Sequence, residues 1–151
     1  MVTKQDIIGS WILVKRGSDD PENAALAVKR YGNAQEGILI VSESGWMNAA
    51  LCHGGRKPLT GNPEWHTDAP EADRLGAFDT YISYAGTWCL KDDVFTTDVR
   101  FSLNPGWVGG KQVRSVKITS DGHLILSLSR AWPDGRVVSG WVKWKRAGLN
   151  R

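Results

Sequence analysis

Acidic, basic, hydroxyl and amide side chains recur at every second position over residues 96–104, and these residue types could carry chemistry. Side chains alternate between the two faces of a β-strand, so Asp98 and Arg100 share one face. If that face lines a cavity, the arginine could hold an oxyanion while the carboxylate moves a proton, as isomerisation, dehydration or β-elimination requires. A solvated ladder on the outside of an antiparallel sheet is the plainer alternative. The polar face also carries Thr96, Ser102 and Asn104, and the opposite face carries Phe95, Thr97, Val99, Phe101 and Leu103.

A neighbouring strand pattern adds a second guanidinium. Arg114 shares a face with Val116 and Ile118, whose apolar side chains belong in a core, so Arg114 is expected to point inward near the mouth of the fold. Two arginines with one carboxylate would leave a net positive site, which suits a ligand with an anionic or enolic oxygen on an apolar body. The predicted catalytic residues are Asp98, Arg100, Tyr84 and Arg114, and the predicted ligand-binding residues are Met47, Ala49, Trp88, Ser102, Trp107, Gln112 and His53.

Two of these residues have plainer alternatives. His53 begins a long loop, so it could reach the cavity mouth as a proton shuttle or remain a solvated loop histidine. Trp107 follows the break at Pro105, and it could cap the cavity or simply anchor the turn.

The elements that must position these side chains are mostly strands. Two runs rich in β-branched and aromatic residues flank a short Lys-Asp-Asp turn at residues 91–93, which predicts a long antiparallel hairpin. Residues 24–31 fit either a helical turn or a strand. About eight to nine strands with one helix have the size of a closed antiparallel up-and-down barrel, an all-β fold. The other predicted strands are residues 10–16, 37–42, 46–51, 111–119, 123–129 and 137–146.

The longest irregular segment, residues 52–68, is rich in glycine and proline and is expected to form a lid over an open end. The one predicted helix follows it and extends to about residue 78. Asp68 is its expected N-cap, with Glu71 three residues on to complete a capping box.

Two segments carry a family resemblance: Gly-Thr-Trp-Cys-Leu at residues 86–90 and the run from Ser102 through Asn-Pro-Gly-Trp-Val-Gly-Gly-Lys to Arg114. They resemble the signature of the lipocalin-like domain family of small bacterial and fungal proteins. Residues 8–14, 37–49 and 140–146 resemble that family's opening strand, second hairpin and closing strand. The resemblance implies a single lipocalin-like barrel domain over residues 1–151, with Trp11 at the barrel floor and Arg146 packed across its indole.

The chain departs from the family pattern at the polar face. In the family, the position of Asp98 usually carries a histidine within a His-His pair, and that of Arg100 an acidic residue. Here Thr97 and Asp98 replace the pair. A histidine can act as a base near neutral pH, whereas this chain offers a carboxylate beside a guanidinium. An activity that relatives owe to the His-His pair therefore does not carry over.

Composition restricts the function classes. The 151 residues are 41% hydrophobic and include eight tryptophans, which suits a single hydrophobic core. The net charge is +3, but the basic residues are scattered along the sequence, which disfavours nucleic-acid binding. No apolar stretch approaches the ~20 residues of a membrane span, and no secretory signal is recognisable, so a cytoplasmic protein is expected. Cys52 and Cys89 lack CxxC or zinc-type spacing, and no phosphate loop or dinucleotide fingerprint occurs. Neither a metal nor a cofactor is expected.

Two function classes follow. The first is a small cofactor-independent enzyme of isomerase, lyase or dehydratase type, acting on a hydrophobic oxygenated metabolite such as a polyketide, terpenoid or aromatic intermediate. The second is a carrier or sensor that holds a similar molecule without chemistry. An inward Asp98, Arg100 and Arg114 would favour the enzyme, and an outward polar ladder would favour the carrier. The expected partner is a hydrophobic small molecule, and a homodimer is left open.

Overall fold

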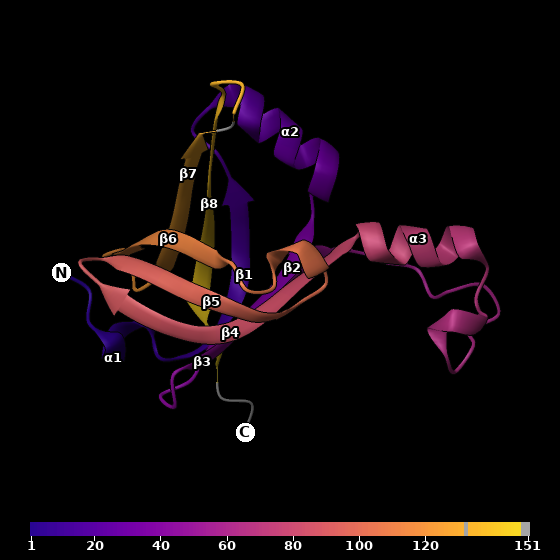
Figure 1. The fold of residues 1–151 in the computed structure, drawn as a ribbon, viewed down its shortest axis with the longest axis horizontal. Coiled ribbons are helices and arrows are strands. Elements are labelled where there is room, and N and C mark those ends of the chain that lie inside the picture. Colours follow the sequence, from indigo (N-terminus) through magenta and orange to yellow (C-terminus); the bar gives the residue numbers. More distant parts are fainter. Residues whose placement is uncertain (132, 149–151) are drawn as a thin grey trace.

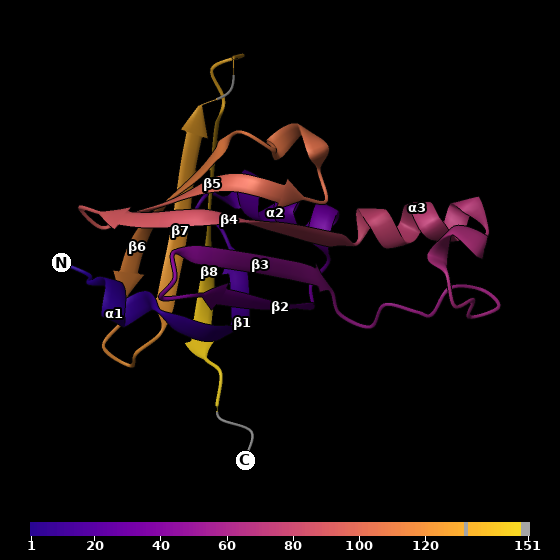
Figure 2. The same cartoon turned by 60° about the horizontal axis from the view of Figure 1, so that its bottom comes forward.

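The chain closes into a β-barrel, seen from two sides in Figure 1 and Figure 2. The computed structural model describes residues 1–131 and 133–148. Within them, eight antiparallel strands each pair with the next along the sequence, and the last pairs with the first. The predicted all-β up-and-down barrel is confirmed. The strands are β1 (Gly9–Gly17), β2 (Gln35–Val41), β3 (Trp46–His53), β4 (Tyr81–Lys91), β5 (Val94–Ser102), β6 (Lys111–Ile118), β7 (Leu124–Ala131) and β8 (Val137–Arg146).

Three α-helices and two short 3-10 helices accompany the strands in the described residues, where the sequence pattern predicted one helix. The ambiguous segment is helical because Asp20 caps its first turn by accepting a hydrogen bond from the Asn23 N–H at 2.8 Å. The predicted capping box is wrong: Asp68 ends a 3-10 helix, and the next helix begins after Pro70 without a side-chain cap. The helices are α1 (Lys4–Ile7), α2 (Pro21–Tyr31), η1 (His66–Asp68), α3 (Glu71–Asp79) and η2 (Pro105–Trp107).

Trp11 closes one end of the barrel. It is 1% exposed, and its indole N–H donates to the Ile7 carbonyl at 2.9 Å. The Arg146 guanidinium lies 4.3 Å from the indole centroid and donates to the Ile8 and Asp6 carbonyls at 2.8 and 2.7 Å. The predicted packing of Arg146 across Trp11 is confirmed, and α1 forms a floor with the first and last strands.

The hairpin of β4 and β5 forms as predicted. Asp92 and Asp93 join the two strands with φ angles of 51° and 58°, and two positive φ values are typical of the type I′ turn that matches strand twist. Phe95 and Val99 of β5 are 2% and 1% exposed. The apolar face of this strand therefore fills the interior.

A β-bulge near the end of β5 reverses the alternation. The β4–β5 register shifts between Ala85 and Gly86, so β5 accommodates one extra residue. Phe101 is consequently 66% exposed instead of lying inside with Val99, as strict alternation predicts. Gly86 permits the close approach of the two strands, since a Cβ there would lie 1.9 Å from the Asp98 carbonyl oxygen.

A second register shift turns Arg16 inward. It lies between Leu13 and Lys15 in the pairing of β1 with β8, so the inner face passes from Leu13 to Arg16. Arg16 pairs with Val142, which packs against the core. The bulge therefore brings a cation to the inside of the barrel wall.

Residues 54–80 form an arm beside the barrel. In both Figure 1 and Figure 2, α3 extends away from the strands, and the closure of this segment as a lid stays a prediction. No residue of α3 is buried, and Leu75 and Phe78 are 60% and 50% exposed, so this helix lacks a buried face that would hold it across the barrel. Helix α2 instead contacts β8 near the rim (Figure 1). Among the described residues, no helix is long and apolar enough to cross a membrane.

Candidate functional site

A pocket of about 430 Å³ opens at the end of the barrel opposite the Trp11 floor. Residues from β1, α2, β3, α3, β4 and the connection between β5 and β6 line it. Its volume lies within the range of small-molecule sites. Most of the apolar and aromatic lining comes from Leu51, Phe78, Tyr81, Ile82, Leu103 and Trp107.

Charged and polar side chains also reach the pocket wall. The structure places His53 there, together with Trp107, so two of the predicted ligand-binding residues meet at one site. Arg16 lines the same wall, and its guanidinium carbon lies 3.7 Å from the ring centroid of Tyr31. This cation–π contact positions a positive charge at the pocket. Asp79, at the exposed end of α3, supplies a carboxylate.

Trp107 connects the pocket with the barrel interior. Its ring packs edge-on against Tyr84, with centroids 5.9 Å apart and an interplanar angle of 77°. The turn that carries Trp107 is held by Asn104, whose side chain accepts the Gly106 N–H at 3.0 Å. Tyr84 faces inward because it pairs across the strands with buried Ala49, and directly opposite residues share a face.

Arg114 lies in the interior, as the alternation of β6 predicts. It pairs with Phe95, which is buried, so both side chains occupy the inner face. The guanidinium donates to Gln112 Oε1 at 2.9 Å and to the Val113 carbonyl at 2.8 Å. The two predicted residues Arg114 and Gln112 are thus in direct contact.

Burial sets the electrostatics of this cluster. It lowers the pKa of Arg114, an effect that Tyr84 opposes and that Arg16 and Arg130 reinforce. Burial also raises the pKa of the Tyr84 phenol, while Arg114 and Arg16 act in the opposite sense. Tyr84 is therefore a neutral hydrogen-bonding group near pH 7. Arg114 remains a cation, because a guanidinium keeps its proton in proteins.

A buried hydroxyl lies on the same wall. Thr97 is 0% exposed, and its Oγ1 has no hydrogen-bond partner among the described residues. Thr97 pairs across the strands with Gln112, the residue that also contacts Arg114. Buried hydroxyls are normally hydrogen-bonded, so this wall has unused capacity for a polar atom.

Asp98 and Arg100 lie on the outer face of the barrel, so their predicted inward orientation is wrong. The Asp98 carboxylate forms an ion pair with Lys111, and these side chains are 44% and 62% exposed. Arg100 is exposed as well. The physical reason is that Phe95 and Val99 bury the apolar face of β5, which leaves its polar face to solvent.

Tyr84, Gln112 and Arg114 lie on the inner wall of the barrel and are not part of the pocket lining. Four further predicted ligand-binding side chains also lie outside the lining. Met47 and Ala49 are each 3% exposed and belong to the core. Trp88 donates its indole N–H to the Ser42 carbonyl at 2.9 Å near the floor. Ser102 donates its hydroxyl to a backbone carbonyl of β4 at 3.2 Å. Contact of these four residues with a ligand stays a prediction.

Arg16 and Tyr31 are pocket residues that the sequence pattern did not single out. Arg16 faces inward because of the register shift in β1, which alternation alone does not reveal. A signal was nevertheless present, since Lys15 and Arg16 are adjacent and successive strand residues face opposite sides. One of these two cations therefore had to point inward, whether or not β1 contained a register shift.

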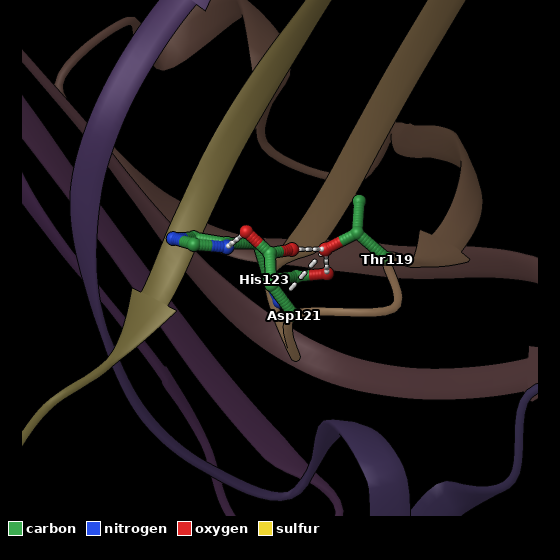
Figure 3. Close-up of polar contacts among 3 residues, drawn as sticks. All are labelled: Thr119, Asp121 and His123. Atoms are coloured by element: carbon green, nitrogen blue, oxygen red, sulfur yellow. Dashed lines mark hydrogen bonds and ion pairs between the residues drawn. The ribbon is translucent and has the colours of Figure 1, made fainter.

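A second polar cluster lies in the turn between β6 and β7, at the floor end (Figure 3). His123 Nδ1 lies 2.9 Å from Asp121 Oδ2, and the Thr119 hydroxyl donates to the same carboxylate. The Thr119 oxygen also accepts the His123 backbone N–H at 2.9 Å. The cluster thus stabilises its own turn. Among the described residues, no group of three His, Cys, Asp or Glu side chains could hold a metal ion.

The chain matches a known protein family. The family model of the lipocalin-like domain matches residues 8–147. No curated protein matches the sequence. The matched range contains all the strands from β1 to β8, and with them Tyr84, Arg114 and the pocket walls.

Proposed function

This chain belongs to the lipocalin-like domain family, and we propose that it binds a hydrophobic small molecule in the pocket at the open end of its barrel. The observation that carries the proposal is the pocket of about 430 Å³, with apolar and aromatic walls, in a barrel whose other end is closed by Trp11. Such a cavity removes an apolar ligand from water and has room for a molecule of metabolite size.

A carrier or sensor is the form of this function that the geometry supports best. An isomerase or lyase needs titratable groups that converge on the ligand. Asp98, the carboxylate expected for proton transfer, lies outside and pairs with Lys111. The pocket wall that remains is mainly apolar, which suits binding without chemistry.

A cofactor-independent isomerase, lyase or dehydratase is the second candidate, and Tyr84 is the observation that favours it. Its buried phenol and the Arg114 guanidinium are close enough to influence each other's pKa. Tyr84 could donate a proton to a developing oxyanion that Arg114 stabilises. Replacement of Tyr84 by Phe would then lower turnover by about 10²–10⁴-fold while ligand binding persists. Unchanged turnover in this variant would exclude the role.

Binding of a neutral fluorescent probe tests the pocket. Nile red should show saturable emission with the wild-type protein because its fluorescence rises in apolar surroundings. Ile82→Trp should fill the pocket and weaken binding by about tenfold or more, which corresponds to roughly 1.4 kcal/mol. Val113→Trp is the matched control, since Val113 is 49% exposed on the outer face and the same residue is introduced there. Full binding by the Ile82 variant would contradict the proposed pocket.

A further inference from the structure

Arg114 is a cation on the inner wall that has no acidic partner among the described residues. Its hydrogen-bond acceptors are neutral: it donates to the Gln112 side chain and the Val113 carbonyl. The described residues form three ion pairs, and none of them includes Arg114. Taking a charge out of water is costly unless an opposite charge compensates it. The barrel therefore keeps an uncompensated positive charge on its inner wall.

Arg16 adds a second positive charge, from strand β1. It reaches the inside from β1 through the register shift after Leu13, and it lines the pocket. Its described contact is with the Tyr31 ring, and it too is absent from the described ion pairs. Arg16 lies close enough to Arg114 to act electrostatically on it. Two like charges held near each other repel, and an anion between them would relieve that repulsion.

Two neutral hydroxyl groups lie on the inner wall with these charges. Tyr84 packs against Trp107 at the pocket wall and is a protonated phenol. The Thr97 hydroxyl is fully buried without a described partner. A hydroxyl can donate to an anionic oxygen, and hydrogen bonds to a charged group are stronger than those between neutral groups. The wall is thus equipped to bind an oxyanion.

We infer that the ligand of this barrel is an apolar carboxylate, with its carboxylate group bound by Arg114 beside Arg16 and its apolar body in the open-end pocket. This inference rests on the proposed function and names its ligand class. A planar guanidinium matches a carboxylate because two parallel N–H groups can donate to its two oxygens. The aromatic lining from Tyr81 and Trp107 suits a ring or an alkyl chain.

Charge also orients the ligand. Asp79 is the carboxylate of the pocket lining, and it lies at the exposed end of α3. Arg16 is half-buried on β1, and Arg114 lies on the inner wall of the barrel. An anionic group is repelled at the mouth and attracted towards the interior, so the carboxylate enters first and the apolar body follows.

Matched pairs of a carboxylate and its amide test the inference by isothermal titration calorimetry at pH 7.5. We choose 1-naphthylacetate with 1-naphthylacetamide, and decanoate with decanamide, because each pair shares its shape and differs in charge. Wild-type protein should bind the carboxylate about tenfold or more tightly than the amide, as expected for charge-assisted hydrogen bonds. Arg114→Met should reduce this ratio by about fivefold or more, because only Arg16 then remains, while affinity for the amide stays within about threefold. Arg114→Lys should retain part of the ratio, since it keeps the charge but loses the planar fork.

Arg100→Met is the matched control, because it removes the same side chain from the outer face. It should keep the wild-type ratio. If Arg114→Met does not fold, judged by circular dichroism, Arg114→Gln takes its place. Equal affinity for carboxylate and amide in wild-type protein, or a preference that is undiminished by loss of Arg114, would overturn the inference. Nile red binding distinguishes the two failures: if the probe binds, the proposed function stands without its charged anchor, and if neither probe nor any pair binds, both fail.

Discussion

Asp121 shows how neighbours control a single exposed carboxyl group. Its pKa is lowered from 3.8 to about 2, mainly by the hydrogen bond from Thr119 and next by the contact with His123 (Figure 3). A carboxyl group that is a stronger acid in the folded state stabilises the fold when ionised. This contribution is complete above about pH 4 and is lost as the pH falls through the folded-state value of about 2.

Asp121→Asn should remove that pH-dependent contribution. We expect the variant to melt below the wild type at pH 6, and the difference between their melting temperatures to shrink as the pH approaches 2. Other carboxyl groups with lowered pKa, such as Asp73, destabilise both proteins alike on acidification and cancel in the difference. A melting-temperature difference that is constant from pH 6 to pH 2 would argue against this coupling.

Asp98 and Arg100 should tolerate substitution. The ion pair of Asp98 with Lys111 is solvent-exposed, and such pairs contribute roughly 0–1 kcal/mol. Asp98→Asn should therefore unfold in urea within about 1 kcal/mol of wild type, and both Asp98→Asn and Arg100→Met should bind ligand normally. Strong loss of binding with intact stability would restore these residues to the site.

At the scale of the strand, two bulges decide which side chains face the ligand. If the apolar face of β5 is placed inside, residue alternation predicts the orientation of its side chains correctly up to Val99. The register shift beyond Val99 then exposes Phe101. In β1 the shift exchanges Lys15 for Arg16 on the inner face. A bulge depends on pairing with another strand, so residue alternation within one strand cannot reveal it. The inward Arg114 was predictable because the described β6 pairings show no shift.

Gly86→Ala should disrupt the β5 bulge. The new Cβ would lie 1.9 Å from the Asp98 carbonyl oxygen, which belongs to backbone and cannot rotate away. We expect a loss of at least about 1–3 kcal/mol in urea unfolding, as for other overpacked sites. Gly76→Ala in α3 is the matched control: its Cβ meets nothing within 4 Å, and alanine should stabilise the helix by about 0.5–1 kcal/mol. Equal effects of the two changes would contradict the steric explanation.

At the scale of the molecule, the barrel and its floor were predictable because they follow from patterns that extend along the whole chain. The strands alternate, and Trp11 and Arg146 stand at opposite ends of the sequence where closure brings them together. The helix α3 was predicted from the sequence, but its position beside the barrel could not be, since its residues bury no face that would specify a docking site. A single domain over residues 1–151, a cytoplasmic location and a homodimer stay predictions.

Trp11→Ala should destabilise the whole barrel. Trp11 is 1% exposed and contacts both α1 and the Arg146 guanidinium, so its removal leaves a large cavity in the floor. The expected loss is ~3–5 kcal/mol in the free energy of unfolding, measured with urea. Trp46→Ala provides the comparison, because Trp46 is 46% exposed and its loss should cost far less. A floor variant as stable as wild type would show that Trp11 is not needed for closure.

The seam between β1 and β8 also governs how the molecule opens. The Ala147 N–H donates to the Ser10 carbonyl at 2.9 Å, so hydrogen bonds join segments from the beginning and the end of the described chain. A strand at the edge of an open sheet can detach by breaking one ladder of hydrogen bonds. Every strand of this closed barrel is held by two such ladders, one on each side. Core amide protons on distant strands should therefore exchange with solvent at similar rates, through one cooperative opening of the ring.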